Sequence, residues 1–528
     1  MYKRQVKTKS KVTCKGVTHE YYDVPEGDVS KIDDSVIYID DIGDGGAKGD
    51  KTQRDIRLLT EGISDGDTSN DLKGRYYFYR ANTYFDSNQH ELAIEDYKKR
   101  IEIGGWVEEV WYSKYRIGLA LERLGRINDA TIAHLHAYQH HPKRAEPLYE
   151  LTRIYRILSN HNISYAFYKL AKEIPYPEND VLFINRNIYS HLLDYELSVI
   201  GYYVGVPNID KLVVKLLNNE GVNLNFQHMM SNYKFYSKNI PTIKVLDFTD
   251  NTLFKGFSSS TPCIISSSNK GYQLYIRHHN YRINADGSYS SGEKITSNYS
   301  VNILDSNLAK KSSFAIEEPM VTELRYTGIE DVKFFPHKSS LCFMGTAQNP
   351  ENKDLLIAFG KRDIGPTNSR LEYTFVKSPE NRRCEKNWAF FSEDDKTLKV
   401  VYEWNKFKTY TVGDDYNLLD GTSNEKTPKF FEHLRGSTNG SRSGDYIWFL
   451  CHLVSFEPHR SYYHVFVIYN TRTKNFVYTV PFKFEGKNVE YALGLIVEDA
   501  RLLVSYSTGD NCSKVAVIEK KEVCKLFA

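Results

Sequence analysis

Two adjacent carboxylates, Glu330 and Asp331, stand in the segment TGIEDVKFF (327–335), just before residues that resemble the start of a buried strand. Two acids placed this close repel each other and lose hydration on burial, so a folded chain must compensate them with a cation or with hydrogen-bond donors. An isolated Glu-Asp pair favours a turn whose carboxylates accept backbone N–H bonds. The same pair suits acid catalysis if one carboxyl protonates a leaving oxygen.

Polar residues that could surround this pair recur along the carboxy-terminal half of the chain, at the predicted ends of strands. They are Arg277, Asn280, Lys333, Lys386, Asn387, Trp388, Arg435, His452, Arg460, His464 and Asp510. The basic members of this set would bind a phosphate group if they converge. For Trp388 the alternative interpretation is packing within a sheet, and for Arg435, His452 and His464 it is a buried polar network between sheets.

The chain from about residue 240 onward predicts an all-β domain. Short aromatic and β-branched runs are separated by polar turns, as in SLCFMGTA (340–347), DYIWFLCHLVSF (445–456), YYHVFVIYN (462–470) and ARLLVSYS (500–507). A four-stranded propeller blade takes roughly 40 to 50 residues. Residues 240–528 therefore predict a five-bladed β-propeller, whose polar loops gather at one mouth of a central channel.

Three motifs carry a family resemblance: G-x-E-D-x-K (328–333), E-K-N (385–387) and S-Y-x-x-x-D (505–510). Together they resemble the five-bladed propellers of the inverting mannoside phosphorylases and their glycoside hydrolase relatives. The resemblance implies that Asp331 is the general acid. Glu330 would point to the other side of an extended segment and hold a loop or a sugar hydroxyl. The chain has Val332 and Lys333 where that family has proline and arginine, which weakens bidentate phosphate recognition there.

Residues 73–238 have the periodicity of amphipathic helices, with internal repetition. The small residues Ala93, Ala130 and Ala166 stand 37 and 36 residues apart. This spacing resembles tetratricopeptide repeats, whose unit is about 34 residues, and predicts an all-α tetratricopeptide-like helical solenoid. Such a solenoid binds peptides or acts as a spacer between other modules, and we favour the spacer.

Four histidines, His134, His136, His140 and His141, cluster around one predicted helix end. Their spacing raises the question of a metal site, but histidines at a helix carboxy terminus are more often surface residues that interact with the helix dipole. No carboxylate or cysteine set stands beside them in the sequence. We therefore predict no metal site here.

Residues 1–72 are too few to form a core of their own, which predicts a short, incomplete α/β piece. The segments KGVTHEYYDV (15–24) and GDGGAKGDKTQRDIRLL (43–59) resemble the carboxy-terminal end of family-two GT-A glycosyltransferases, with His19 at the position of a metal-ligating histidine. A divalent metal is expected only in an intact domain of that kind. The first five residues, MYKRQ, are those that a sequencing adapter would encode, so we expect a truncated chain.

Composition excludes several classes of function. The 69 basic and 67 acidic residues give a formal charge of +2, so nucleic acid is not an expected partner. No apolar run approaches the roughly 20 residues that a transmembrane helix needs. The seven scattered cysteines fit neither a disulfide framework nor a zinc site and are expected to be small core residues. We therefore expect a cytoplasmic location.

The sequence as a whole predicts a carbohydrate-active protein of glycan or polysaccharide assembly. The propeller would transfer or phosphorolyse a glycosyl unit with inversion, without a cofactor, on a glycan or a sugar phosphate. The first alternative is a non-catalytic, glycan-binding propeller that serves a truncated glycosyltransferase. The second is a scaffold that recruits protein partners through its helical repeats.

Overall fold

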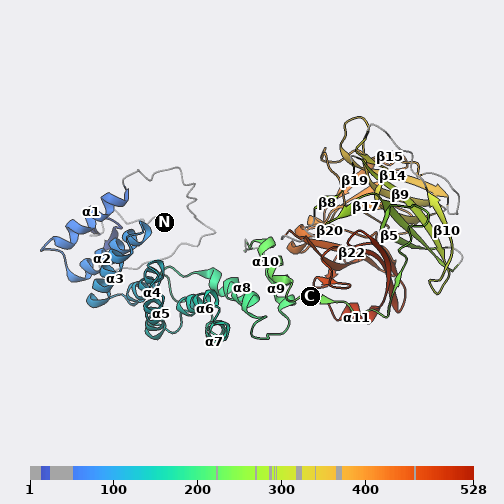
Figure 1. Ribbon diagram of the computed structural model, residues 1–528. Coiled ribbons are helices and arrows are strands. Elements are labelled where there is room, and N and C mark those ends of the chain that lie inside the picture. Colours follow the sequence, from blue (N-terminus) through green and yellow to red (C-terminus); the bar gives the residue numbers. More distant parts are fainter. Residues whose placement is uncertain are drawn as a thin grey trace. The chain divides into compact units, whose positions relative to one another are not determined.

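The computed structural model describes residues 13–23, 51–219, 221, 224–267, 270–284, 288–290, 292, 294–316, 324–338, 340–363, 371–456 and 460–528. The chain divides into two compact units, Met1–Val206 and Pro207–Ala528. The first unit contains the helices drawn in blue to blue-green in Figure 1, and the second contains the β-sheets. Each unit is described by itself below.

The first unit is built from stacked helices. They are α1 (Lys51–Ser64), α2 (Asn70–Asp86), α3 (His90–Ile103), α4 (Val107–Arg123), α5 (Ile127–His140), α6 (Glu146–Ile157), α7 (His161–Lys172), the π-helix η1 (Ile188–Leu192) and α8 (Leu193–Ile200). The helices α2 and α3, α4 and α5, and α6 and α7 form successive packed pairs. The predicted helical region is thus confirmed. None of the described helices is both long and apolar enough to cross a membrane.

Each pair packs closely because a small residue stands at the same place in the second helix. The fourth residue of α3, α5 and α7 is Ala93, Ala130 and Ser164, and all three are fully buried. The Ser164 hydroxyl donates a hydrogen bond of 2.7 Å to the carbonyl oxygen of Thr152 in α6. The prediction that Ala166 marks the third repeat is wrong, because Ala166 is exposed and the small buried residue lies two positions earlier.

The clustered histidines do not converge. His134 is buried against α4, where a Cβ atom added to Gly118 would lie 2.5 Å from the His134 ring. Neither His134 ring nitrogen has a hydrogen-bond partner within the described part of the chain, and burial lowers the pKa of His134 to about 3, so the ring is neutral. His141 instead lies 2.9 Å from the Asp180 carboxylate. Across the described ranges, no three His, Cys, Asp or Glu side chains are placed to hold a metal ion.

The amino-terminal piece is described only over residues 13–23, as the hairpin β1 (Thr13–Lys15) and β2 (Tyr21–Asp23). His19 stacks on Tyr79 of α2 with ring centroids 4.1 Å apart. Burial lowers the pKa of His19 and favours the neutral ring. Residues 43–50, the start of the second segment that resembles glycosyltransferases, lie outside the described residues, so the glycosyltransferase interpretation stays a prediction.

The second unit begins with α9 (Ile209–Leu217) and α10 (Phe226–Tyr233), before the predicted start of the β domain at 240. Tyr233 of α10 donates a hydrogen bond of 2.7 Å to the Pro481 carbonyl, and Asn218 donates one of 2.7 Å to the Tyr478 hydroxyl. These two helices therefore pack on sheet residues.

Among the described residues, five sheets have four strands or more. The first joins β5 (Ser258–Ser266), β6 (Tyr272–His279), β9 (Ile295–Leu304), β10 (Lys310–Ile316) and β11 (Tyr326–Thr327). The second joins β12 (Glu330–His337), β13 (Ser340–Gln348), β14 (Leu355–Asp363) and β15 (Thr374–Phe375). The third joins β16 (Ala389–Phe391), β17 (Lys399–Glu403), β18 (Lys408–Val412) and β19 (Leu418–Thr422).

The fourth joins β20 (Arg435–Gly436), β21 (Ser441–Ser443), β22 (Tyr446–Ser455), β23 (Ser461–Asn470), β24 (Phe476–Tyr478), β25 (Phe482–Lys483) and β3 (Lys238–Asn239). The fifth joins β26 (Glu490–Val497), β27 (Arg501–Thr508), β28 (Cys512–Glu519) and β4 (Lys244–Asp247). A two-stranded ribbon, β7 (Arg282–Ile283) with β8 (Tyr289–Ser290), extends beyond β6.

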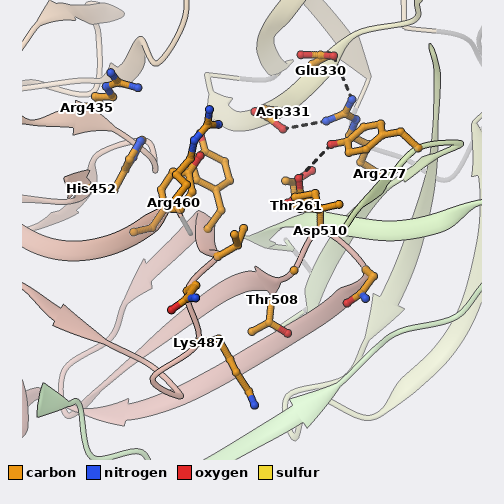
Figure 2. A pocket seen from close by; sticks show the side chains of 18 of the residues that line it. Thr261, Arg277, Glu330, Asp331, Arg435, His452, Arg460, Lys487, Thr508 and Asp510 are labelled. Atoms are coloured by element: carbon orange, nitrogen blue, oxygen red, sulfur yellow. Dashed lines mark hydrogen bonds and ion pairs between the residues drawn. The ribbon is translucent and has the colours of Figure 1, made fainter. Parts of the chain in front are cut away.

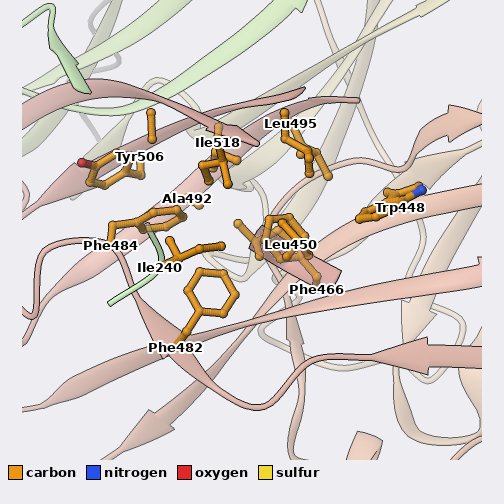
Figure 3. Packing of buried hydrophobic residues seen from close by; sticks show 14 of the residues in the cluster. Ile240, Trp448, Leu450, Phe466, Phe482, Phe484, Ala492, Leu495, Tyr506 and Ile518 are labelled. Carbon is orange, nitrogen blue, oxygen red and sulfur yellow. The ribbon is translucent and has the colours of Figure 1, made fainter. Parts of the chain in front are cut away.

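The sheets follow one another along the chain as antiparallel meanders, which makes the second unit propeller-like. An early strand closes the arrangement, because β4 pairs with the last long strand, β28. Figure 3 shows the apolar core between the fourth and fifth sheets, where Leu450 and Phe466 meet Ala492 and Ile518. The strands predicted at 340–347, 445–456, 462–470 and 500–507 are all present.

The seven cysteines are all free thiols. Cys263, Cys342 and Cys451 are buried, as predicted for small core residues. The prediction is wrong for the other four, because Cys14, Cys384 and Cys524 are exposed and Cys512 is half-buried.

The close contact between α4 and α5 gives a prediction for folding stability. Gly118→Ala places a methyl group against the buried His134 ring, and we expect the free energy of unfolding to fall by about 1 to 3 kcal/mol, as is typical of overpacking. Urea denaturation followed by circular dichroism would measure this change in the free energy of unfolding. Gly66→Ala, where nothing lies within 4 Å of the added atom, is the matched control. Equal effects of the two substitutions would contradict the packing argument.

Candidate functional site

A cavity of about 610 Å³ lies in the second unit and gathers most of the predicted polar residues (Figure 2). Nine of them line it: Arg277, Glu330, Asp331, Lys386, Asn387, Arg435, His452, Arg460 and Asp510. They come from the first strands of successive sheets, from the loops before those strands, and from neighbouring strands and turns. The sheets thus bring together side chains that are far apart in the sequence.

Arg277 in β6 is the cation that compensates the acidic pair. Its side chain is only 3% exposed. Its Nε donates a hydrogen bond of 2.9 Å to the Ser297 hydroxyl, and its Nη1 donates one of 3.3 Å to Oδ1 of Asp331. Its Nη2 lies 3.3 Å from Oε1 of Glu330. Both carboxylates therefore converge on one guanidinium group, as Figure 2 shows.

Glu330 is held in its ionised form. Burial by itself would raise the pKa of Glu330, but the charges of Arg277 and Lys386 outweigh burial and leave the pKa below its ordinary value. The Lys386 ammonium lies 3.5 Å from Oε2 of Glu330. Glu330 is therefore an acceptor and a counter-ion rather than a proton donor at neutral pH.

The backbone at Asp331 places both acids on the same side. Asp331 has a φ of +51°, and the pairing of β12 with β13 shifts between Glu330 and Lys333, which marks a bulge. Tyr299 holds this bulge, because its hydroxyl donates to the Ile329 carbonyl (2.9 Å) and accepts from the Val332 N–H (3.3 Å). The expectation that Glu330 points away from Asp331 is wrong, because the bulge interrupts the alternation of the strand.

Asp510 lies in the turn between β27 and β28, and its pKa is shifted in the opposite direction to that of Glu330. The Tyr281 hydroxyl donates a hydrogen bond of 3.1 Å to Oδ2 of Asp510, and His279 Nε2 lies 2.9 Å from the Asp510 carbonyl oxygen. Burial, and after it the negative charge of Asp331, raise the pKa of Asp510 to about 6. Asp510 therefore keeps a proton in mildly acidic solution, where an ordinary aspartate is ionised.

Two arginines form a separate basic group on the cavity lining. The guanidinium groups of Arg435 and Arg460 both lie over the Phe456 ring, 5.5 and 5.7 Å from its centroid. Stacking on an aromatic ring orients a guanidinium while it remains able to bind an anion. His452 does not add to this charge: it is buried, its Nδ1 lies 2.8 Å from the Ser437 hydroxyl, and burial lowers its pKa well below the ordinary value. The neutral His452 ring can offer a hydrogen bond but no charge.

Lys333 and Trp388 do not line the cavity, and both predictions as binding residues are corrected. The Lys333 ammonium donates a hydrogen bond of 2.6 Å to the Trp388 carbonyl, and burial lowers its pKa to about 8. The Trp388 indole donates to Oε2 of Glu385 at 3.2 Å and packs edge-on against Tyr402. Packing within a sheet, the alternative interpretation of Trp388, is the one that fits.

His464 and Asn280 are also away from the cavity lining. His464 is fully buried and packs against Phe484 at 4.7 Å between ring centroids, and burial lowers its pKa to about 3. Asn280 ties a loop to the start of β9, because its amide donates to the Lys294 carbonyl (3.0 Å) and its Oδ1 accepts from the Thr296 N–H (2.9 Å). The contacts of both residues are within the fold.

Sequence reasoning missed several residues of the lining. They include Thr261, Tyr281, Tyr462, Lys487 and Tyr491. Thr261 has a φ of +41°, which is unusual for a β-branched residue, and its hydroxyl has no hydrogen-bond partner in the part of the chain that the structure describes. Thr261 directly precedes Pro262, but that dipeptide alone is too common to identify a site.

No protein-family model matches this sequence, and no curated protein matches it either. Solved structures match over the propeller-like region. A β-1,2-mannobiose phosphorylase from Listeria innocua matches at 12% identity and a TM-score of 0.39, over 54% of this chain and 99% of the other. A GDP-Man-dependent mannosyltransferase from Leishmania mexicana matches at 13% and 0.38, over 55% and 93%, and a mannose phosphorylase from the same organism at 12% and 0.35, over 56% and 94%.

The raised pKa of Asp510 predicts how the stability of the protein depends on pH. Because the folded protein holds this proton more tightly than the unfolded chain, the protonated carboxyl stabilises the fold most below about pH 4. This contribution is lost as the pH rises through 6. We expect Asp510→Asn to raise the free energy of unfolding by about 1 to 2 kcal/mol at pH 7.5, and to give no gain at pH 4, since one pKa unit corresponds to about 1.4 kcal/mol before solvent screening.

Thermal denaturation at the two pH values would measure this difference. Asp499→Asn, at an exposed carboxyl that does not line the cavity, is the control. The same stability change at both pH values would show that Asp510 is ionised in the folded protein.

Proposed function

We propose that the second unit is a five-bladed propeller whose cavity binds a glycan and a phosphate group and transfers a glycosyl unit between them with inversion. The observation that carries this proposal is the pair of opposite proton affinities in one cavity: Glu330 is kept ionised, and the pKa of Asp510 is raised to about 6. Environments that push the pKa values of two carboxyl groups apart in this way are typical of acid catalysis on sugars. Tyr281, Tyr462 and Tyr491 add flat faces that suit sugar rings.

In the proposed reaction, the proton that Asp510 holds passes to Asp331, which donates it to the glycosidic oxygen as the bond from that oxygen to the anomeric carbon breaks. A phosphate oxygen attacks the anomeric carbon from the opposite face, so that a sugar 1-phosphate and a shortened glycan leave. The reverse reaction elongates a glycan. Asp331 is the general acid that the sequence suggests, and Asp510 stores the proton in the free protein, because the charge of Asp331 is one cause of its raised pKa.

The basic group supports phosphate as the second substrate. Arg435 and Arg460 line the same cavity as the acids. Guanidinium groups bind phosphate oxygens through paired hydrogen bonds. Arg277 and Lys386, by contrast, are engaged with the acidic pair. We therefore assign the binding of the anion to Arg435 and Arg460.

Two other functions remain to be distinguished from transfer. A glycan-binding propeller without turnover would use the same tyrosines and polar residues. A scaffold would depend on the helical unit, and its function would be indifferent to changes in the cavity.

Incubation of the purified protein with sugar 1-phosphates and a panel of oligosaccharides, with phosphate release as the readout, tests the proposal. We expect Asp331→Asn to lower turnover by about 100- to 10,000-fold, the usual effect of losing a general acid. In the same variant, the pH above which residual turnover falls should move below 6, because the charge that helps to raise the pKa of Asp510 is gone. Asp499→Asn should leave turnover unchanged. Glycan binding without turnover would instead support the lectin-like alternative.

The basic group predicts a separate effect on phosphate. Arg435→Gln and Arg460→Gln should each raise the KM for phosphate or sugar 1-phosphate by about 10-fold, the factor that corresponds to losing roughly 1.4 kcal/mol of binding. The affinity for a neutral oligosaccharide should change little, because these side chains are assigned to the anion. Lys474→Gln, at a lysine that pairs with Glu393 and does not line the cavity, is a control for lost charge. An equal loss of glycan affinity would contradict the assignment.

A further inference from the structure

The loop between α7 and η1 contains the segment DVLFIN (180–185), whose main chain is held by charged side chains of the helical unit. Oε2 of Glu108, in the first turn of α4, accepts hydrogen bonds from the backbone N–H groups of Val181 (2.9 Å) and Leu182 (2.7 Å). One carboxylate oxygen thus receives two successive amides of the DVLFIN segment.

The carbonyl side of the segment faces Arg144 and Glu146, at the start of α6. Arg144 donates to the carbonyl oxygens of Leu182 (3.3 Å) and Phe183 (3.4 Å). Glu146 accepts from the N–H of Asn185 at 3.4 Å and also pairs with Arg144. Arg144 and Glu146 are 0% and 1% exposed, and charges buried this deeply require partners. The main chain of the DVLFIN segment supplies some of these partners.

Three side chains of the segment fit complementary surroundings. The Asp180 carboxylate lies 2.9 Å from His141 Nε2 and 3.3 Å from Arg144 Nη1. Leu182 packs on the apolar cluster around Phe78. The Phe183 ring lies 4.9 Å from that of Tyr112 in α4. These contacts place an acidic residue, an aliphatic residue two positions later and an aromatic residue directly after it against complementary groups of the helical unit.

The segment is nevertheless an imperfect occupant. The Val181 and Phe183 side chains are 76% and 54% exposed, although both are apolar. Phe183 also has a φ of +48°, a conformation that costs energy for a bulky residue. The segment therefore occupies this surface at a conformational cost.

We propose that the DVLFIN segment is an internal occupant of a peptide-binding groove formed by α2, α4 and the start of α6, and that an extended peptide of a partner protein displaces it. The partner peptide carries the pattern acidic–any–aliphatic–aromatic, because these are the residue types for which the groove has complementary groups. The proposal does not depend on the function of the propeller-like unit. It assigns to the helical unit a binding event in which the loop is released.

A labelled peptide of residues 177–186, PENDVLFINR, tests the proposal on the full-length protein. In the double variant Val181→Pro/Leu182→Asp, proline removes one N–H that Glu108 accepts and aspartate cannot pack on the apolar cluster, so the internal segment should leave the groove. Fluorescence anisotropy should show at least 10-fold tighter peptide binding by this variant than by the wild type, because an internal competitor acts at a high effective concentration.

Two controls make the result specific. A peptide with the leucine and phenylalanine both changed to alanine should bind at least 10-fold more weakly. Adding Glu108→Ala to the double variant should abolish binding, because it removes the acceptor of two main-chain amides. A double variant that keeps wild-type circular dichroism but does not bind the peptide would overturn the proposal. Binding that is unaffected by Glu108→Ala would do the same.

Hydrogen exchange in the unmodified protein keeps the proposal testable if the double variant does not fold. The amides of Val181 and Leu182 should exchange through local opening, faster than the amides inside α4 and α6, and addition of the unlabelled peptide should accelerate their exchange. Exchange of these amides only on global unfolding would show that the segment is a fixed part of the fold. A dimer in light scattering that exchanges this segment between copies would make the occupant a second chain, and would also overturn the proposal.

Discussion

The cavity of the propeller-like unit depends on one buried cation, Arg277. A guanidinium that is 3% exposed is stable only when carboxylates and other acceptors surround it, and Glu330, Asp331 and the Ser297 hydroxyl supply them. This requirement explains the bulge in β12: a regular strand would send one of the two adjacent acids to the opposite face. The positive φ at Asp331 is therefore the conformational cost of bringing two neighbouring carboxylates to the same arginine.

The sheets hold this arrangement in place from outside. Tyr299 in β9 bonds to the backbone on both sides of the acidic pair, so that the first sheet fixes the bulge of the second. Ser505 in β27 donates to the Pro262 carbonyl and accepts from the Ile264 N–H, which ties the fifth sheet to β5. Pairing of β4 with β28 then joins the beginning of the β region to its end. The positions of Thr261 and Asp510 are thus set by contacts between sheets distant in sequence.

The sequence predicted the elements better than the directions of their side chains. Long runs such as 445–456 form the expected strands because aromatic and β-branched residues there are buried on both faces. The motifs predict site positions for Lys333, which ends G-x-E-D-x-K, and for Trp388, which follows E-K-N. The β12 bulge and the core around Tyr402 nevertheless turn both away from the cavity. The prediction for Ala166 is wrong for a similar reason. The spacing between alanines indicated a repeat, but the register of the helix places Ser164 at the contact.

Charge also couples the groups that line the cavity. Arg277 lies 3.3 Å from Asp331, and the negative charge of Asp331 is one of the causes that keep the Asp510 proton in place. Under the proposed function, a phosphate bound at Arg435 and Arg460 would bring further negative charge into the same cavity. Like charge disfavours ionisation of a carboxyl, so the bound anion would raise the pKa of Asp510 still further. Substrate binding would then itself retain the proton that the reaction consumes.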